Sequence, residues 1–375
     1  MSGAATLNEV CEFIVDCLHA TAPVQEQGFP LIRTPNIGKG RLLLDGVYRV
    51  SEDTYRTWTQ RATPQAGDLI LAREAPAGNV AVVKEGENVC LGQRTVHLRP
   101  DKTKIDPDYL CYLLLTPLYQ GRLLAAETGA TAKHVNMKDI RRLKLDALPT
   151  IEQQRHVGQV IAAYDDLIEN NRRRIALLEQ SARLLYREWF VHLRFPGHEH
   201  VKVVDGVPEG WERKPLKEIA TLNYGKALKE ELRQPGHYPV YGSSGIVGSH
   251  VAGLTSGPGI IVGRKGNVGS VYWSPVAFFA IDTVYYISVE QSSLYLYYAL
   301  RDAQFMSTDV AVPGLNRDFA YSRQFLVPSA PLLAEFIEAV TPFHKQIEKL
   351  TLFNEKLLEA RDLLLPRLMS GDLVV

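Results

Sequence analysis

The sequence predicts an α+β fold with two β-rich domains, separated along the chain by two long antiparallel coiled-coil helices, and an internal pseudo-twofold repeat. Two segments carry apolar residues at alternating steps of four and three over about four heptads, the spacing of a coiled-coil seam. The first seam consists of Val157, Ile161, Tyr164, Ile168, Asn171, Ile175, Leu178, Ala182, Leu185 and Trp189. Adding 179 to each number gives the second, which consists of Phe336, Val340, Phe343, Ile347, Leu350, Asn354, Leu357, Arg361, Leu364 and Leu368. The same offset maps Leu148-Pro149 onto Val327-Pro328.

The first predicted domain, residues 1–148, is a mixture of strands and loops. Strands are expected at 67–73, 80–83 and 95–98, where apolar runs follow turn residues. A helix is expected over 108–124, with Asp106 or Asp108 as its cap and Pro107 near its first turn. The first long helix then occupies 149–195, between Pro149 and the turn residues that begin at Phe195.

The second predicted domain, residues 209–328, repeats the order of the first. Residues 257–264 correspond to 67–73, 266–269 to 78–81, 283–284 to 95–96, and 295–298 to 109–112. The second long helix occupies 329–375. Spacing differs between these pairs, so we expect a shared scaffold with different loops.

Each seam needs an apolar partner, and two such helices pack most simply on each other in antiparallel fashion. A helix of about 40 residues is roughly 60 Å long, whereas one turn of DNA is about 34 Å. The two domains could therefore engage sites more than one DNA turn apart. Asn171 and Asn354 interrupt the two seams at different depths, and a buried polar residue in a seam often fixes its register. Arg361 is expected at a frayed or partner-facing end.

Composition and charge exclude several classes of protein. A hydrophobic content of 46% and a charged content of 22% describe an ordinary globular protein, and the apolar runs are too short for a transmembrane helix. The first twenty residues lack the basic start of a secretory signal. Cys11, Cys17, Cys90 and Cys111 form no CxxC pair, so we expect small core thiols and a reducing cytoplasm.

The charge is balanced throughout. Residues 1–148 carry 18 basic and 17 acidic side chains, and residues 198–328 carry 12 of each. A protein bound to DNA by phosphate neutralisation alone would be more basic. Any nucleic-acid role must therefore depend on local surfaces or on a partner that contributes charge.

Polar loops that could contact DNA bases or phosphates occur at corresponding places in both halves. Arg and Lys suit guanine edges and phosphates, and Asn suits adenine edges, although ordinary turn chemistry is the alternative for each residue. In the first half the candidates are Arg73, Arg94, Thr131, Lys133, His134 and Asn136, with Glu74 beside them. In the second half they are Arg264, Lys265, Asn267, Asn316 and Arg317.

Two further segments have two interpretations each. The turn Tyr238–Gly245 presents Tyr241, Ser243 and Ser244 between glycines, and its amides could hold a phosphate or simply close a strand. Arg172, Arg173 and Arg174 lie within the first long helix. They are either a solvated face or a surface for DNA phosphates or an acidic partner.

The motifs of several enzyme classes are missing. The sequence has no Gly-x-x-x-x-Gly-Lys-Ser/Thr phosphate loop and no Gly-x-Ser-x-Gly nucleophile turn. Asp106-Pro107-Asp108-Tyr109 lacks the second proline of the methyltransferase tetrapeptide (Asp/Asn)-Pro-Pro-aromatic. His192, His198 and His200 have no cysteine nearby, so a solvated linker is favoured over a metal site.

Four segments in order resemble the specificity subunit of type I restriction-modification systems. The first runs from Leu148-Pro149-Thr150 through Asp165–Asn171 to Arg187-Glu188-Trp189-Phe190, and the second is Pro208-Glu209-Gly210-Trp211-Glu212. The others are Tyr238–Gly245 and the ending Leu364-Leu365-Pro366-Arg367-Leu368-Met369-Ser370-Gly371. The resemblance covers nearly the whole chain, and residues 6–35 match less distinctly.

The resemblance implies two target-recognition domains, each of which reads half of a split double-stranded DNA site. The helices would act as a spacer and dock two modification (methyltransferase) subunits, with Arg172–Arg174 as the expected docking surface. Restriction (translocase/nuclease) subunits would join that complex. The chain itself would have no catalytic residues, metal or cofactor, because S-adenosylmethionine and ATP would act in the partners. The alternatives are a specificity component of another restriction-like defence system, a diverged methyltransferase or nuclease, and a tandem β-rich adaptor for proteins or sugars.

Overall fold

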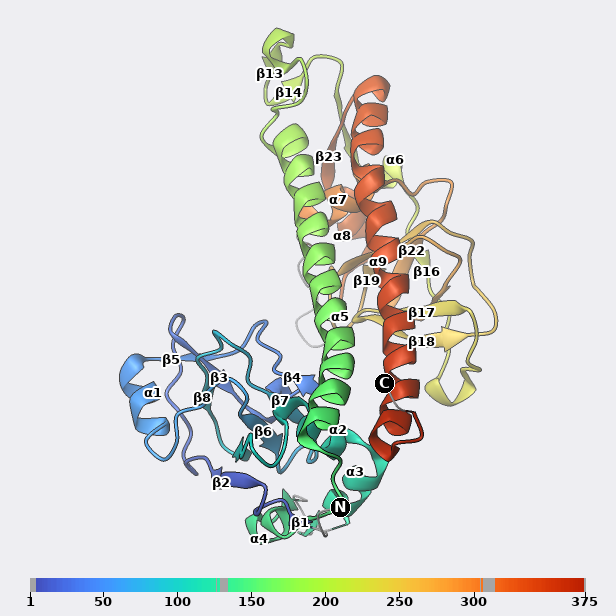
Figure 1. Ribbon diagram of the computed structural model, residues 1–375. Helices are drawn as coiled ribbons and strands as arrows, with labels where there is room; N and C mark the ends of the chain where they lie inside the picture. The colour runs from blue at the N-terminus through green and yellow to red at the C-terminus, as the bar shows by residue number, and fades with distance from the viewer. Residues whose placement is uncertain (1–4, 126, 129–133, 304, 306–313, 374–375) are drawn as a thin grey trace. The chain divides into compact units, whose positions relative to one another are not determined.

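The computed structural model describes residues 5–125, 127–128, 134–303, 305 and 314–373. The chain forms two compact units. Unit 1 comprises Met1–Asn171 and Phe353–Val375, and unit 2 comprises Arg172–Leu352. The two long helices, α5 (Ile151–Tyr186) and α9 (Ala330–Ser370), each contribute one part to each unit (Figure 1). The mixture of β-rich regions and long helices confirms the predicted α+β class.

Unit 1 contains a five-stranded sheet in the order β2-β9-β6-β7-β4 and a three-stranded sheet in the order β5-β3-β8. The first sheet comprises β2 (Cys11–Asp16), β9 (Thr95–Pro100), β6 (Leu69–Ala72), β7 (Val80–Val82) and β4 (Gly40–Arg41). The second comprises β5 (Arg49–Val50), β3 (Phe29–Ile32) and β8 (Cys90–Leu91). Short pairs join β1 (Ala5–Thr6) to β12 (Lys144–Leu145) and β10 (Glu127–Thr128) to β11 (His134–Val135). The helices are α1 (Glu52–Trp58), α2 (Pro107–Leu115), α3 (Pro117–Leu124) and α4 (Met137–Arg141).

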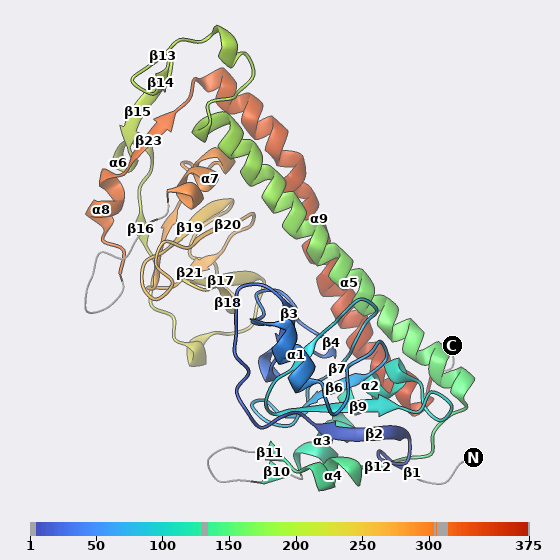
Figure 2. The same cartoon turned by 90° about the vertical axis from the view of Figure 1, so that its left-hand side faces the viewer.

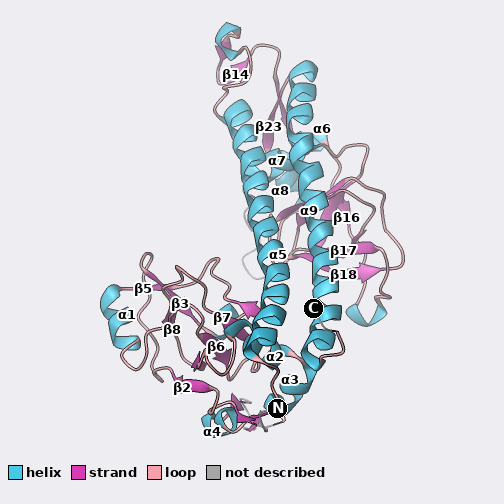
Figure 3. Cartoon of the chain, in the orientation of Figure 1, coloured by secondary structure: helices cyan, strands magenta, loops and turns pink. Residues whose placement is uncertain are grey.

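Unit 2 contains a four-stranded sheet in the order β16-β22-β19-β20 and a three-stranded sheet in the order β18-β17-β21. The first comprises β16 (Asn223–Tyr224), β22 (Val284–Ile287), β19 (Gly259–Gly263) and β20 (Val271–Ser274). The second comprises β18 (Gly245–His250), β17 (Tyr238–Gly242) and β21 (Phe279–Ala280). Two more pairs are β13 (Val203–Val204) with β14 (Val207–Pro208) and β15 (Glu212–Pro215) with β23 (Gln324–Val327). The helices are α6 (Leu216–Ile219), α7 (Leu294–Asp302) and α8 (Arg317–Ser322) (Figure 3).

The strand orders of the two units match. β2-β9-β6-β7 in unit 1 corresponds to β16-β22-β19-β20 in unit 2, and all these pairs are antiparallel. In the smaller sheets β3 and β17 each have one antiparallel and one parallel neighbour. The repeated order of elements that the sequence predicts is therefore confirmed. Two of the predicted residue correspondences are wrong, because Gly78 is equivalent to Gly269 rather than Gly266, and Val96 is equivalent to Tyr285 rather than Val284.

Two predicted helix boundaries need correction. The helix expected over 108–124 is two helices, because Thr116 adopts an extended conformation immediately before Pro117, as residues that precede proline generally do. Asp106 is the cap of the first of these, and its carboxylate accepts a hydrogen bond of 2.9 Å from the Tyr109 amide. The first long helix, expected over 149–195, begins at Ile151 and ends earlier, because it continues past Tyr186 only as a π-helical turn, Arg187–Val191, which buries Trp189 and Phe190.

The two seams face each other in antiparallel register. All twenty seam positions are buried or half-buried. Within unit 1, the Asn171 side-chain amide donates a 2.9 Å hydrogen bond to the side-chain oxygen Oδ1 of Asn354. Within unit 2, the rings of Trp189 and Phe336 lie 5.7 Å apart. The two contacts fit one register, because each partner is 18 residues from its counterpart on the same helix but in opposite chain directions. In each unit the α5 part lies beside the α9 part (Figures 1 and 2).

The antiparallel register explains the depths of the two asparagines. Asn171 is the fifth position of the first seam and Asn354 is the sixth position of the second. Because the helices run in opposite directions, these two positions lie opposite each other. Asn354 also donates to the Ile168 carbonyl oxygen at 3.3 Å. Both amides are thus buried and hydrogen-bonded, as a residue that sets register should be.

The prediction that Arg361 lies at a frayed or partner-facing end is wrong. Its side chain is only 14% exposed and forms an ion pair with the buried carboxylate of Asp165. Asp165 directly follows the seam position Tyr164 and is not itself a seam position. The apolar periodicity therefore did not predict that Asp165 is the partner of Arg361. The seam therefore contains a buried charge pair in unit 1.

The remaining global expectations concern thiols and membranes. All four cysteines are buried and free, and burial raises the pKa of the Cys11 and Cys90 thiols to about 12. They are the small core residues that the sequence predicts. In the described part of the chain, no helix combines the length and the apolar character required to span a membrane.

Candidate nucleic-acid interface

The structure brings the predicted contact segments together at the end of the central strand of each unit. Arg73 follows β6, and its amide donates to the Arg94 carbonyl oxygen at 3.1 Å. Arg264 follows β19, and its amide donates to the Thr283 carbonyl oxygen at 2.9 Å. Two segments that are separate in the sequence therefore meet at one strand end in each unit.

The third segment reaches both strand ends in the same way. The Val135 amide donates to the Arg73 carbonyl oxygen at 2.9 Å, and the Leu315 amide donates to the Arg264 carbonyl oxygen at 2.8 Å. Isolated bridges pair Glu74 with His134 in unit 1 and Lys265 with Gly314 in unit 2. These contacts make Arg73 equivalent to Arg264 and Glu74 equivalent to Lys265.

We call the unit 1 group of Arg73, Glu74, Arg94 and His134 strand-end site 1. Arg94 Nε lies 3.1 Å from Glu74 Oε2, and Arg94 has a φ of 69°, in the left-handed region. The four side chains line a hollow of about 270 Å³ together with His19 and Gln93. His19 bonds Asp16, and Arg61 also pairs with Asp16. The cations of this site are thus accompanied by carboxylates.

We call the unit 2 group of Tyr224, Arg264, Lys265 and Arg317 strand-end site 2. The Tyr224 ring is 48% exposed, with the guanidinium carbon of Arg264 at 5.2 Å and that of Arg317 at 5.0 Å from its centroid. Lys265 and the neighbouring Asn267 are exposed. Sequence reasoning found the cations but missed Tyr224, because a single tyrosine in a short strand carries no pattern of its own.

The backbone of β19 and its turn holds strand-end site 2 in place. A Cβ atom on Gly263 would lie 2.2 Å from the Asn267 carbonyl oxygen and 2.3 Å from Ser270 Oγ. Only glycine fits there, so the turn from Lys265 to Ser270 can fold back tightly. Below it, the Tyr285 hydroxyl donates to the Leu315 carbonyl oxygen at 3.0 Å, and burial raises the pKa of Tyr285 to about 12.

The two predicted asparagine readers stand at the starts of equivalent short helices. Asn136 is the N-cap residue of α4, and Asn316 is the N-cap residue of α8. The Asn316 side-chain oxygen accepts hydrogen bonds from the amides of Asp318 at 2.8 Å and Phe319 at 3.1 Å. The Asn316 side chain therefore caps a helix, whether or not it also contacts a base.

Within the turn Tyr238–Gly245, burial separates the predicted contacts. Tyr241 is 5% exposed and packs edge-on against Phe278, while Ser243 is 8% exposed. The Ser243 carbonyl oxygen accepts hydrogen bonds from Ser270 Oγ at 2.7 Å and from the Tyr272 hydroxyl at 3.1 Å. The burial of Tyr241 and Ser243 does not fit direct DNA contact. Both residues instead pack inside unit 2, where Tyr241 contacts Phe278 and Ser243 contacts Ser270 and Tyr272. Ser244 is exposed.

The sequence analysis did not predict the unit 1 counterpart of this turn, Arg33-Thr34-Pro35. Leu31 pairs with Cys90 in the same parallel register in which Val240 pairs with Phe279. Arg33-Thr34-Pro35 therefore corresponds to Gly242-Ser243-Ser244. Arg33 is exposed with its guanidinium 4.2 Å from the Tyr48 ring centroid, and Thr34 Oγ1 donates to the Ala75 carbonyl oxygen at 3.1 Å. The signal that could have found Arg33 is the repetition of Phe29-Pro30 as Tyr238-Pro239.

Several predicted residues are placed elsewhere or lie outside the described part. Thr131 and Lys133 fall outside the described residues. Arg172, Arg173 and Arg174 are exposed on α5, away from both strand-end sites in the sequence and at the start of the unit 2 part of that helix. Among the described residues, no group of histidine, cysteine and carboxylate side chains could hold a metal ion.

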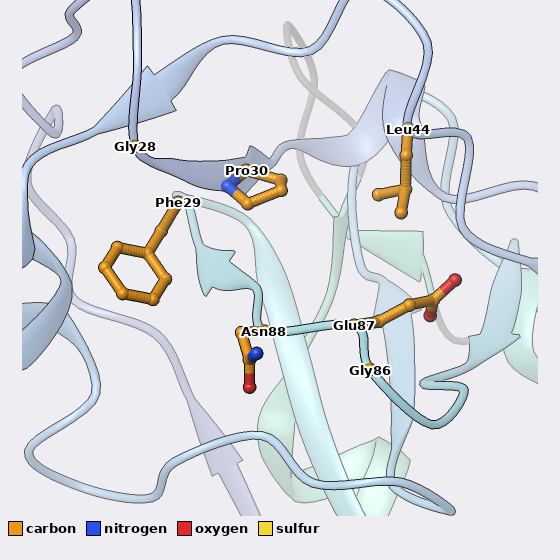
Figure 4. Close-up of a pocket in the computed structure, with 7 residues that line it drawn as sticks. All are labelled: Gly28, Phe29, Pro30, Leu44, Gly86, Glu87 and Asn88. Carbon is orange, nitrogen blue, oxygen red and sulfur yellow. The ribbon is translucent and has the colours of Figure 1, made fainter.

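A second hollow in unit 1, of about 400 Å³, lies apart from strand-end site 1. Figure 4 shows its lining, which consists of Gly28, Phe29, Pro30, Leu44, Gly86, Glu87 and Asn88. The Glu87 carboxylate accepts a hydrogen bond of 2.8 Å from the Lys84 amide. Its one ionisable lining residue is thus engaged in the turn that forms the wall, and the hollow contains none of the predicted contacts.

Comparison with known proteins gives one consistent group. The family described as "Type I restriction modification DNA specificity domain" matches residues 5–180 and 208–319. The chain is 24% identical over 366 residues to the type I restriction enzyme MjaIX specificity subunit of Methanocaldococcus jannaschii, a match that covers 88% of this chain and 83% of that protein. It is 21% identical over 400 residues to the HindI specificity subunit of Haemophilus influenzae, covering 82% and 86%.

A solved structure shares the fold. The crystal structure of the S subunit of a type I restriction-modification system from M. genitalium gives a TM-score of 0.62 at 17% sequence identity, covering 97% of this chain and 95% of that one. At this identity the likeness establishes the fold alone.

Proposed function

Because this chain belongs to the family of type I restriction-modification DNA specificity domains, we propose that each of its units reads one half of a bipartite double-stranded DNA site. The observation that carries the proposal is the pair of strand-end sites. Both occupy the end of the central strand in the same sheet order, and both gather arginine side chains from segments far apart in the sequence. Arginine is the side chain that most often recognises guanine edges and phosphates.

The two sites are not identical, which suits the reading of two different half-sites. Glu74 in unit 1 stands where Lys265 stands in unit 2. A carboxylate accepts hydrogen bonds from a base amino group, whereas an ammonium donates them to base oxygens and nitrogens. Two copies of one scaffold can therefore recognise different bases.

The long helices would set the gap between half-sites and dock two modification subunits, which restriction subunits would join. The outer face of the unit 2 part of α5 carries Arg174 and exposes Leu177 (61%) and Leu184 (51%). Apolar side chains flanked by cations suit a protein partner with an apolar, acidic surface. Arg172 and Arg173 precede this surface.

The chemistry would reside in the partners. We propose that this chain holds no cofactor and catalyses no step, and that methyl transfer from S-adenosylmethionine and ATP hydrolysis occur in the modification and restriction subunits. The absence of a phosphate loop and of the methyltransferase tetrapeptide supports this assignment.

Methylome sequencing of a host with and without the chain tests the proposal. We expect one split motif to be methylated only when the chain is present together with its modification subunits. Methylation of a continuous motif, or no change on deletion of the chain from an active system, would contradict the bipartite reading.

Exchange of one domain tests the assignment of half-sites. Replacing residues 209–328 by the corresponding region of a relative should change one half of the motif and leave the other half and the gap intact. A change in both halves would exclude the model of two independent readers.

A matched insertion tests the spacer. One heptad added to both helices, between Asn171 and Arg172 and between Leu352 and Phe353, keeps every seam position in register. We expect the gap between half-sites to change while both half-sites persist. An unchanged gap would rule out the spacer role.

The balanced charge leads to a further expectation about affinity. The chain alone should bind its site weakly, with the modification subunits adding much of the affinity, because few phosphates can be neutralised by a chain of zero net charge. Titration of the site with the purified chain and with the complex measures the difference. Nanomolar binding by the chain alone at physiological salt would contradict it.

A further inference from the structure

The two strand-end sites differ at a second equivalent position. Asp16 pairs with Val96 across β2 and β9, and Tyr224 pairs with Tyr285 across β16 and β22. Val96 and Tyr285 are themselves equivalent, because they pair with Leu71 and Val262, each two residues before the strand-end arginine. Unit 2 therefore has Tyr224 where unit 1 has a carboxylate.

The difference changes the charge of the sites. In unit 1, Asp16 pairs with His19 and Arg61, and Glu74 pairs with Arg94. In unit 2 the equivalent positions hold Tyr224 and Lys265. Across the described ranges no carboxylate lies within ion-pair distance of Arg264, Lys265 or Arg317. Among the described residues, strand-end site 2 thus gathers three cations without an acidic partner.

Tyr224 also determines how two of these cations are held. The Arg264 and Arg317 guanidinium groups lie over the same ring, at 5.2 and 5.0 Å from its centroid. Arg264 Nη1 donates to the Asp282 carbonyl oxygen at 3.2 Å, which further fixes that side chain. Arg317 Nε is buried and has no hydrogen-bond partner. The ring therefore orders two planar donor groups before any ligand binds.

We propose that Arg264, Arg317 and Tyr224 form a preordered acceptor-binding site of unit 2, which takes paired oxygen or nitrogen acceptors of DNA. The acceptors are either the O6 and N7 atoms of a guanine or two oxygens of a phosphate, both of which match the guanidinium fork. Tyr224 is the positioning residue of this site. Strand-end site 1, with Asp16 and Glu74, lacks this function, so the two half-sites are bound unequally.

This inference rests on the proposed function, and its test begins with the complex of the chain and its modification subunits. Binding is measured at a series of salt concentrations. The ligands are a duplex that carries the motif identified by methylome sequencing and duplexes in which one base pair of that motif is substituted. The variants are Arg264→Gln, Arg317→Gln and Tyr224→Leu. Tyr224→Phe keeps the ring, Arg73→Gln changes the equivalent residue of unit 1, and Arg213→Gln removes an exposed cation of unit 2 outside the site.

A phosphate contact and a guanine contact predict different changes in the binding measurements. A phosphate contact predicts that each arginine variant lowers the slope of log affinity against log salt by about 0.9 for all duplexes. A guanine contact predicts that an arginine variant loses about 5- to 150-fold of discrimination at one base pair of the unit 2 half-site, with little change in slope. Tyr224→Leu should reproduce part of either loss, Tyr224→Phe should bind as the unchanged complex does, and Arg73→Gln and Arg213→Gln should have smaller effects.

Wild-type affinity and discrimination in both arginine variants would overturn the site. Equal losses in Tyr224→Phe and Tyr224→Leu would overturn the positioning role of the ring, and an equal loss in Arg73→Gln would overturn the inequality of the half-sites. Failure of the unchanged complex to prefer any motif would instead refute the proposed function. Circular dichroism of each variant separates these outcomes from misfolding.

Discussion

The two units make the same contact with the long helices, but the contact is charged in unit 1 and neutral in unit 2. In helix contact 1, the Tyr112 hydroxyl on α2 donates to Asp165 Oδ2 on α5 at 2.7 Å. In helix contact 2, the Tyr298 hydroxyl on α7 and His344 Nε2 on α9 share a hydrogen bond of 2.7 Å. Asp165 and His344 are 179 residues apart, so the repeat places the same tyrosine contact at the same seam-flanking position in both units.

Helix contact 1 is charged. Asp165 is also paired with Arg361, and both side chains are largely buried. A Cβ on Gly40, whose φ is 95°, would lie 2.8 Å from Asp165 Oδ2, so the chain packs closely around the pair. Burial, together with the Asp165 charge, raises the pKa of Tyr112 and keeps its hydroxyl protonated as a donor.

Helix contact 2 is neutral. Burial, aided by the nearby Arg301, lowers the pKa of His344 to about 4. The imidazole packs among the rings of Trp273, Tyr297 and Tyr298. The repeat therefore preserves the position of a hydrogen bond between a tyrosine of the globular part and a side chain of the long helix. The charge of the helix side chain at that position differs between the two units.

The largest effect is expected from removal of one charge of helix contact 1. Asp165→Ala removes the buried partner of Arg361 and leaves its guanidinium with only the exposed carboxylate of Asp362, so it should destabilise unit 1 by up to roughly 3–5 kcal/mol. Hydrogen–deuterium exchange of α2 and of the unit 1 part of α5 measures the loss. The double variant Asp165→Leu, Arg361→Leu should recover most of it, because no buried charge is then left unpaired and Asp362 is exposed to solvent. A double variant as unstable as the single one would show that the ion pair itself, rather than the orphaned charge, carries the effect.

The next largest effect is a pH dependence confined to unit 2. The unfolded chain protonates His344 near pH 6.5, but the folded unit resists protonation until about pH 4. Between these values protons favour the unfolded state, so stability is full above pH 6.5 and falls by about 3 kcal/mol as the pH drops to 4.

Denaturant unfolding followed by tryptophan fluorescence measures this loss, because Trp189, Trp211 and Trp273 all belong to unit 2. His344→Gln keeps a hydrogen-bonding side chain but does not titrate, so its stability should fall less across the same window. Parallel pH profiles for the two proteins would exclude His344 as the source.

A smaller effect separates the two tyrosines. Tyr112→Phe removes a hydrogen bond to a charged group, which is worth roughly 1.5–3 kcal/mol, whereas Tyr298→Phe removes one between neutral groups, worth roughly 0.5–1.5 kcal/mol. Denaturant midpoints for unit 1 and unit 2 provide the comparison. Equal losses would mean that the charge of Asp165 does not strengthen its contact.

The sequence predicts the frame of these contacts better than their chemistry. Apolar periodicity and the 179-residue offset predict both helices, their antiparallel pairing and the order of strands, because burial imposes a regular spacing on side chains. The partners of Arg361 and Tyr224 lie across the fold, and nothing in local spacing encodes such a contact. Tyr241 and Ser243 are likewise buried. The sequence did not predict this, because tyrosine and serine suit a tight turn as well as a DNA contact.

The smallest effect concerns the start of α8, which is equivalent to the start of α4 in unit 1. Asn316 caps α8 through two hydrogen bonds to backbone amides, so Asn316→Ala should cost unit 2 about 1 kcal/mol. Asn316→Ser supplies another capping oxygen but no amide, and should retain most of the stability. If Asn316 also reads an adenine, both variants should lose discrimination at one base pair of the unit 2 half-site, even though only the alanine variant loses stability. Full discrimination in the serine variant would assign Asn316 to the helix cap alone and leave base reading in unit 2 to the neighbouring cations.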